Sequence, residues 1–232
     1  LGPEHPDTLT AHSNLAASYS LAGRTGDAIT IQERVAADRE RLLGPEHRDT
    51  LTAHANLASS YRQAGRTGDA ITILERVAVE LERLLGPEHP DALTAHSNLA
   101  ASYSLAGRTG DAITILERVV AELERLFGPE HPDALTAHFR LAASYWQGGR
   151  TGDAITILER VAAELERLFG PEHPDTLSAY VNLASSYRLA GRTGDAITIQ
   201  ERVVAELERL LGPEHPHTIA SADALQLWMA GG

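Results

Sequence analysis

The sequence predicts an all-α fold of stacked helical hairpins, and three observations lead to this prediction. The string LGPEHPDTLTAH at Leu1 returns with small changes every 42 residues, and residues 1–42 match residues 85–126 at 37 of 42 positions. Apolar residues recur three, four or seven positions apart within each repeat, and no segment alternates with a period of two. Glycine interrupts each repeat between two such segments and again at its end. A period of this length is typical of proteins that bury a continuous core by stacking.

The domain prediction is a single repeat array over residues 1–232. The predicted repeats are 1–42, 43–84, 85–126, 127–168 and 169–210, followed by a C-terminal cap at 211–232. In the cap, the run from Leu225 to Met229 departs from the repeat, as expected where an end repeat must close the core differently. We expect Trp228 and Met229 to pack within this cap rather than to bind a ligand.

The first helix of each repeat is predicted to begin at His5-Pro6-Asp7 and to run to about residue 22. Proline suits the first helical position, aspartate complements the positive end of the helix dipole, and His5 and its equivalents fit a capping role. Gly23 should end the helix. The expected buried face consists of Ala11, Leu15, Ala16 and Tyr19.

The second helix is predicted to begin with Thr25 as its N-cap and Asp27 in its first turn. Gly44 followed by Pro45 should end it. The expected buried face consists of Ala28, Ile31, Val35 and Leu42.

These residues resemble the tetratricopeptide repeat (TPR). The resemblance lies in the run from Asn14-Leu15-Ala16 through Tyr19 to Gly23, followed by Asp27-Ala28, and it covers essentially the whole chain. The 42-residue length and the linker Leu43-Gly44-Pro45-Glu46-His47 are similar to the version found in kinesin light chains and in bacterial signalling ATPases. The resemblance implies a right-handed superhelix, an α-solenoid whose first helices line a concave groove and whose second helices form the outer surface.

The resemblance also implies where a partner would bind. In many members an asparagine of the first helix lines the groove and holds the ligand backbone; the matching residues here are Asn14, Asn56, Asn98 and Asn182. Two departures from the family pattern stand out. Histidine replaces the bulky aromatic residue near the start of the first helix, at His12, His54, His96 and His138. Leucine, or Gln32 and Gln200, replaces the aromatic residue in the middle of the second helix.

Much of the variation among the first helices of the five repeats falls at three positions on the predicted groove face. The first varies as Ser13, Ala55, Ser97, Phe139 and Val181, and the second as Asn14, Asn56, Asn98, Arg140 and Asn182. The third varies as Ser20, Arg62, Ser104, Trp146 and Arg188. Positions six or seven apart project to one side of a helix, so these columns face the same way. The fourth repeat is the most altered, with Phe139, Arg140, Trp146 and Gln147 together.

Two interpretations of this variation stay open. Aromatic and arginine side chains dominate binding energy when buried in an interface, so the cluster indicates a binding hot spot. Solvent-exposed positions that drift freely would also vary while the core stays constant. If the cluster binds, a peptide or protein segment of acidic and apolar character would suit Arg62, Arg140, Arg188 and Trp146.

Several classes of function are disfavoured. The net charge of −12 argues against nucleic-acid binding, and no run approaches the ~18–20 apolar residues of a membrane span. We expect no metal and no cofactor, because equivalent histidines of successive repeats lie at least ~8–10 Å apart. A ladder of histidines could instead make the stacking sensitive to pH. We expect no enzyme either: the repeated Gly-Arg-Thr-Gly lacks the features of a phosphate loop, and there is no cysteine nucleophile and no singular catalytic constellation.

The predicted function is that of a protein-interaction module, and a second class stays open beside it. The array could serve as a self-assembly or sensor scaffold of a larger signalling ATPase, by end-to-end or groove contacts between copies. The chain opens inside the repeat pattern at Leu1, so we expect it to be part of a longer protein. All 20 basic residues are arginine, which hints at a GC-rich bacterial genome, and we expect a cytoplasmic location.

Overall fold

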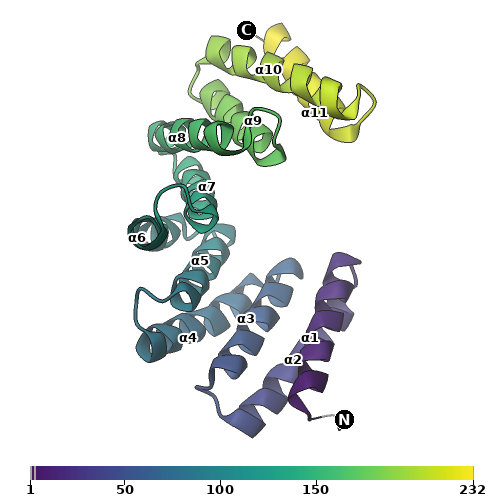
Figure 1. The fold of residues 1–232 in the computed structure, drawn as a ribbon, viewed down its shortest axis with the longest axis vertical. Coiled ribbons are helices and arrows are strands. Elements are labelled where there is room, and N and C mark those ends of the chain that lie inside the picture. The colour runs from purple at the N-terminus through teal and green to yellow at the C-terminus, as the bar shows by residue number, and fades with distance from the viewer. Residues whose placement is uncertain (1, 3, 232) are drawn as a thin grey trace. The chain divides into compact units, whose positions relative to one another are not determined.

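The computed structural model describes Gly2 and residues 4–231, and within these residues it contains helices and no strand (Figure 1). The helices are α1 (Pro6–Leu21), α2 (Thr25–Leu43), α3 (Arg48–Gln63), α4 (Thr67–Leu85), α5 (Pro90–Leu105), α6 (Thr109–Phe127), α7 (Pro132–Gln147), α8 (Thr151–Phe169), α9 (Pro174–Leu189), α10 (Thr193–Leu211) and α11 (Pro216–Ala230). Every first helix begins 42 residues after the previous one. The all-α prediction and the hairpin repeat are confirmed.

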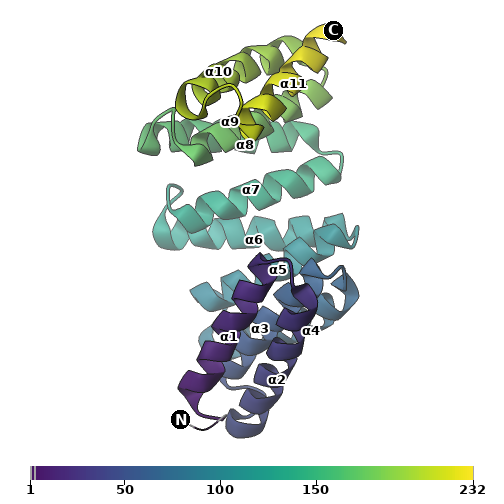
Figure 2. The same ribbon diagram turned by 90° about the vertical axis from the view of Figure 1, so that its right-hand side faces the viewer.

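The chain packs as two compact units that divide in sequence between Glu122 and Leu123, within α6. In the first unit α1 packs on α2, α2 on α3, and so on to α5; in the second unit the same order runs from α7 to α11 (Figure 2). From α1 to α5 and from α7 to α11, each helix thus contacts its neighbours in the sequence, as expected of a repeat array. One continuous solenoid over residues 1–232 stays a prediction, and its residues 1, 3 and 232 lie outside the described part.

The histidine before each first helix is a helix cap, as predicted. In α1 the backbone N–H of Asp7 donates to Nδ1 of His5 at 3.2 Å. The same bond recurs at 3.1–3.3 Å in the four later repeats and in the C-terminal cap, from His47 to His215. The bond satisfies one of the amide groups that a helix leaves unpaired at its start.

The cap predicted for the second helix is wrong. Thr25 is the first helical residue, and the N-cap is Arg24, whose side chain makes no capping hydrogen bond. The guanidinium of Arg24 is committed elsewhere: its Nε donates to Asp27 at 2.7 Å, and it lies 4.2 Å from the centre of the Tyr19 ring. The acidic residue of the first turn therefore holds an arginine that also covers the tyrosine of the preceding helix.

The buried face of the second helices differs in part from the predicted one. In α4 it consists of Ala70, Ile71, Leu74, Val77, Ala78 and Leu81. The predicted alanine and valine are therefore correct, but the residue matching Ile31 is only half-buried and Leu84, which matches Leu42, is 42% exposed. Several apolar residues fit a helical spacing in this segment, and the contacts with the neighbouring helices select among them.

The first helix of the chain buries less than its equivalents do. Leu15 of α1 is 43% exposed, whereas Leu57, the same residue of the next repeat, is 6% exposed. Ala11 is exposed and Ala53 is fully buried. The predicted face is therefore correct for α3, where a second helix packs against it, and only partly buried in α1.

Candidate functional site

A cleft of about 570 Å³ lies between α7 and α9 in the second unit. It is lined by Phe139, Ala142, Ala143 and Trp146 of α7, Leu158 of α8, and Asp175, Ser178, Asn182, Ser185 and Ser186 of α9. The residues of α7 stand three, four and seven positions apart, so they share one face of that helix. The cleft therefore lies between two successive first helices, and the two helices line it with different faces, since only Ala143 and Ser185 hold equivalent positions.

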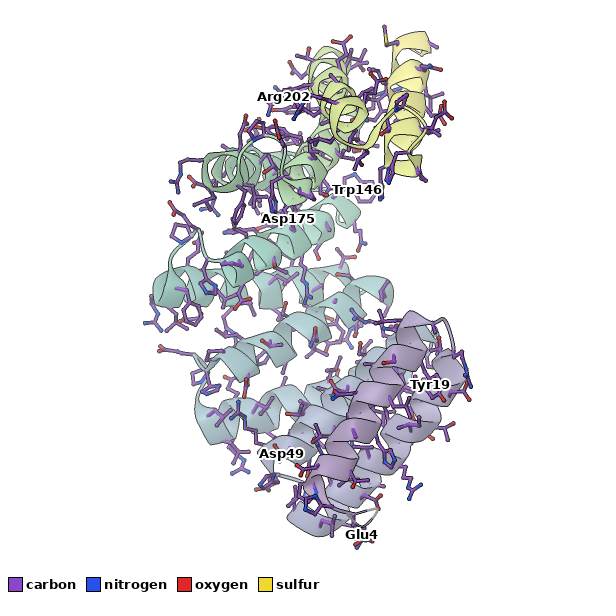
Figure 3. All side chains as sticks on the ribbon, turned by 45° about the vertical axis from the view of Figure 1, so that its right-hand side comes forward. Glu4, Tyr19, Asp49, Trp146, Asp175 and Arg202 are labelled. Carbon is purple, nitrogen blue, oxygen red and sulfur yellow. The ribbon has the colours of Figure 1, made fainter. Side chains whose placement is uncertain are left out.

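The chemistry of the cleft is apolar at its aromatic residues and polar along α9. Trp146 is 47% exposed, although an indole gains free energy by burial. Ala142 and Ala143 leave space beside it because their side chains are small. Ser178, Asn182 and Ser185 present hydroxyl and amide groups from the opposite helix. Figure 3 labels Trp146 and Asp175 on their two helices.

The structure brings three of the predicted site residues into this cleft: Phe139, Trp146 and Asn182. Asn14, Asn56, Arg62 and Asn98 belong to the first unit. Gln147 is exposed, and Arg140 and Arg188 are half-buried, but none of these three is among the residues that line the cleft. The positive charge expected to favour an acidic partner is therefore absent from the described lining of this cleft.

Sequence reasoning missed Asp175, Ser178 and Ser185. They stand seven and four positions before Asn182 and three after it, so the helical period that grouped the variable columns could have found them. They were overlooked because their columns vary little between repeats. A site composed of one variable helix and one nearly constant helix shows only half of itself in such a comparison.

A second cleft, of about 580 Å³, lies among α9, α10 and α11. Trp228 lines it together with His217 of α11 and Leu207 and Leu211 of α10. Trp228 is half-buried, in keeping with its predicted place in the cap, but Met229 is largely exposed and does not pack there. The prediction for Met229 is wrong, because its side chain is 58% exposed and does not line this cleft.

Histidines of the first helices link successive repeats. Nε2 of His54 lies 2.9 Å from Glu40 of the preceding second helix, and Nε2 of His96 lies 2.6 Å from Glu82. His138 and Glu124 repeat the contact at 2.8 Å in the second unit. In the fifth repeat a tyrosine takes this position, since the hydroxyl of Tyr180 donates to Glu166. Each of these four contacts joins the second helix of one repeat to the first helix of the next, and we call such a contact a tether.

Arginines also bind the glutamates of these tethers, and, together with burial, their positive charge lowers the pKa values of two of the histidines. Arg118 donates to Glu82 at 3.1 Å, and Arg160 lies 2.9 Å from Glu124. Burial, together with the arginine, lowers the pKa of His96 below its ordinary value, although the carboxylate of Glu82 opposes this shift. The pKa of His138 is lowered for the same reasons. The two carboxylates are taken up by these structural pairs, and no cluster of three metal-ligating side chains occurs among the described residues.

A second tether uses the tyrosine of the first helix. The hydroxyl of Tyr61 donates to Glu33 of the preceding repeat at 2.7 Å, and Tyr103 donates to Glu75 at 2.6 Å. In the second unit, burial and the bond to Glu159 raise the pKa of Tyr187 to about 12. Each of these bonds joins a second helix to the following first helix, and neither Tyr187 nor Glu159 is among the residues that line the α7–α9 cleft.

Comparison with known proteins agrees with this structure. The pattern of the tetratricopeptide repeat matches residues 7–78, 69–123, 91–163 and 133–205. The protein KINESIN LIGHT CHAIN-RELATED 2 of Arabidopsis thaliana is 55% identical over 42 residues, which are 18% of this chain and 6% of that protein. This match spans a small part of its curated relative.

Two solved structures are similar over most of the chain. One is a putative kinesin light chain of Podosopora anserina with nearly identical TPR-like repeats; its TM-score is 0.81 at 31% identity, over 90% of this chain and 99% of that chain. The other is a signal transduction ATPase with numerous domains and a tetratricopeptide repeat sensor, from Pyrococcus horikoshii. Its TM-score is 0.72 at 13% identity, over 97% of this chain and 32% of that chain, and it shows the fold alone.

None of the described helices combines the length and the apolar character needed to cross a membrane. Proteins built of these repeats generally act as non-enzymatic scaffolds that bind peptides or other proteins. The repeats of this chain have the 42-residue length and the linker of the kinesin-light-chain kind. The matched segments extend over most of its length, and the chain belongs to the tetratricopeptide repeat family.

Proposed function

We propose that this chain is a protein-interaction module and that the α7–α9 cleft holds a peptide or protein segment. The observation that carries the proposal is the exposed Trp146, which stands in one cleft with Phe139 and Asn182. Large aromatic residues supply much of the binding energy at protein interfaces when a partner buries them. Contiguous exposed apolar surface is otherwise unfavourable.

The polar residues of the cleft are suited to hydrogen-bond the backbone of an extended ligand. The carboxamide of Asn182 offers both donors and acceptors, and it stands opposite the aromatic residues of α7. An apolar side chain of the ligand would pack against Phe139 and Trp146 while its peptide groups bond to α9. We infer that Arg140, Gln147 and Arg188 flank the cleft, and that Asn14, Asn56, Arg62 and Asn98 line a similar groove in the first unit.

A selection experiment tests this proposal. A library of random 12-residue peptides would be selected on the protein, and the affinity of each selected peptide would be measured by fluorescence polarisation for the wild type and for Phe139→Ala/Trp146→Ala. Loss of a buried aromatic anchor costs about 2 kcal/mol or more, so we expect binding at least roughly tenfold weaker. The control is Val79→Ala, since Val79 is exposed on α4 and alanine stands at this position in the other repeats. If the selected peptides bind the double variant as tightly as the wild type, the proposal is wrong, and the variation in repeat four reflects the drift of exposed positions.

A second candidate function is self-assembly within a larger sensor protein. Apolar side chains are exposed on both end helices, at Leu15 of α1 and at Ile219 and Leu227 of α11. The likeness to the repeat sensor of the signal transduction ATPase also favours this candidate. Light scattering should then show a mass that rises with concentration, and a constant monomer mass up to about 1 mM would remove the assembly.

The proposal includes a cytoplasmic, non-catalytic role without metal or cofactor. It is supported by the use of the described carboxylates and histidines as structural pairs between repeats. Cell fractionation of the tagged full-length protein tests the location. Turnover of a substrate by the purified chain would contradict the non-catalytic part.

A further inference from the structure

We propose that the α7–α9 cleft selects a segment in which a basic side chain neighbours an apolar one. The apolar group packs against Phe139 and Trp146, and the basic group pairs with Asp175 at the start of α9. This inference rests on the proposed function and assigns the charge of the ligand. It replaces the acidic partner that the sequence favours with a basic one.

Asp175 is the charged residue among the described residues that line the cleft. Its carboxylate is 68% exposed, and its contact with Nδ1 of His173, at 3.7 Å, is too long for a hydrogen bond. The other lining groups are apolar, hydroxyl or amide. A carboxylate near aromatic faces attracts a guanidinium or an ammonium, by ion pairing and by cation–π contact.

In the first unit, a guanidinium binds the aspartate at the position equivalent to Asp175. Asp91 holds the equivalent position on α5, and its Oδ2 accepts from Nη2 of Arg48 at 2.6 Å and from Nε at 2.8 Å. Arg48 stands 43 residues before Asp91, and the residue 43 before Asp175 is Pro132. The cation that neutralises Asp91 from within the chain thus has no counterpart at Asp175, and a partner can supply it.

The arginines around the cleft leave this position available. Arg160 is paired with Glu124 at 2.9 Å, Arg192 with Asp195 at 2.7 Å, and Arg202 with Glu166 at 2.9 Å. Arg140 and Arg188 are half-buried and do not line the cleft. The net charge of −12 also favours the approach of a basic segment at low salt.

The test uses peptides selected from the random 12-residue library on the wild-type protein. Each selected peptide would be compared with copies in which its arginine or lysine is changed to glutamine or to glutamate. The protein variants are Asp175→Asn and, as a matched control, Asp133→Asn, which removes the same charge from the same position of α7. Thermal unfolding followed by circular dichroism confirms that both variants fold.

We expect the selected peptides to carry arginine or lysine within a few residues of an aromatic or aliphatic residue. Asp175→Asn should weaken their binding roughly fivefold to tenfold at low salt, and Asp133→Asn should leave it unchanged. Peptides whose arginine or lysine is replaced by glutamine should bind the wild type and Asp175→Asn with equal affinity. Selected peptides that depend on Trp146 but are acidic, or that ignore Asp175→Asn, would overturn this inference and leave the proposed function standing. Peptides that ignore Phe139→Ala/Trp146→Ala would overturn both.

Discussion

Two glycines lie three positions apart at the start of α4, and only the first of them needs to be glycine. Gly65 has φ +75°, in the left-handed region, and the N–H of Arg66 donates to the carbonyl of Tyr61 at 2.8 Å across it. Gly68 lies within α4 instead, in the helical conformation that any residue adopts. A Cβ at either position would meet no atom within 4 Å, so backbone conformation alone separates them.

Alanine at these two positions should therefore act in opposite directions. We expect Gly65→Ala to lower the free energy of unfolding by about 1 kcal/mol, because a Cβ strains the left-handed conformation. Gly68→Ala should raise it by up to ~1 kcal/mol, since alanine has the higher helix propensity. Urea unfolding followed by circular dichroism measures both. A loss of stability at Gly68 as large as at Gly65 would contradict this explanation.

Burial at one repeated leucine sets the cost of its removal. Leu57→Ala should destabilise the protein by about 2–5 kcal/mol, because the side chain is almost fully buried. Leu15→Ala removes the same atoms from the same repeat position but should cost no more than about 1 kcal/mol, since that leucine is already half in solvent. The two variants, unfolded by urea under the same conditions, check each other. Equal costs would mean that Leu15 is covered in solution.

At the scale of the element, we expect the tethers that His96 and His138 make to the preceding second helix to respond to pH. His96 and His138 have pKa values lowered by burial, so the folded state disfavours their protonation. A histidine of this kind stabilises the fold above the unfolded pKa of about 6.5, and its contribution falls as the pH drops below that value. The melting temperature should therefore be lower at pH 5.5 than at pH 7.5.

Repeat five supplies the variant that tests this dependence. Tyr180 makes the same tether to Glu166 without a group that titrates in this range, so His96→Tyr/His138→Tyr should keep the fold and flatten the decline from pH 7.5 to 5.5. His12→Tyr is the control, because the described chain contains no preceding second helix with a glutamate that His12 could contact. A decline in melting temperature of equal size in the double variant and the wild type would remove the histidines from the explanation.

Helix position and type could be predicted from the sequence, whereas helix contacts could not. His5, Pro6 and Gly44 mark helix ends by local chemistry, and the structure confirms all three. The N-cap at Thr25 failed because Arg24 is held by Asp27 and by the ring of Tyr19, a contact between two helices. The helical period likewise admitted Leu42 to the buried face, although the packing of the neighbouring helices leaves that position exposed.

The difference between local sequence signals and contacts between helices also explains which residues of the candidate site could be predicted. Phe139 and Trp146 were found because they differ from the residues at the same positions of the other repeats, and Asn182 was found because it matches the groove asparagine of the family. Asp175 was missed because an aspartate recurs at this position in every full repeat. What differs is the residue 43 positions earlier, which is Arg48 in the second repeat and proline in the other full repeats. That this residue can bind the aspartate of the next repeat is known only from the contact of Arg48 with Asp91 in the structure.

At the scale of the whole molecule, α1 and α5 separate the effect of packing from that of sequence. The two helices differ only at one position, Thr8 in α1 and Ala92 in α5. α1 buries two residues, whereas α5 buries nine, because α4 of the preceding repeat packs against α5 and the described chain has no second helix before α1. In a repeat array the total stability is close to a sum of contacts between neighbouring repeats, so an end helix opens more readily than an interior helix of the same sequence.

We expect amide hydrogens in the middle of α1 to exchange at least roughly tenfold faster than their α5 equivalents, which corresponds to about 1.4 kcal/mol. Hydrogen–deuterium exchange with fragment separation measures the two segments in one sample, and their intrinsic exchange rates are nearly the same. Equal protection of α1 and α5 at low protein concentration would show that stability in this chain does not depend on the number of packed neighbours. Equal protection that appears only at high concentration would indicate that a second copy covers the exposed face of α1.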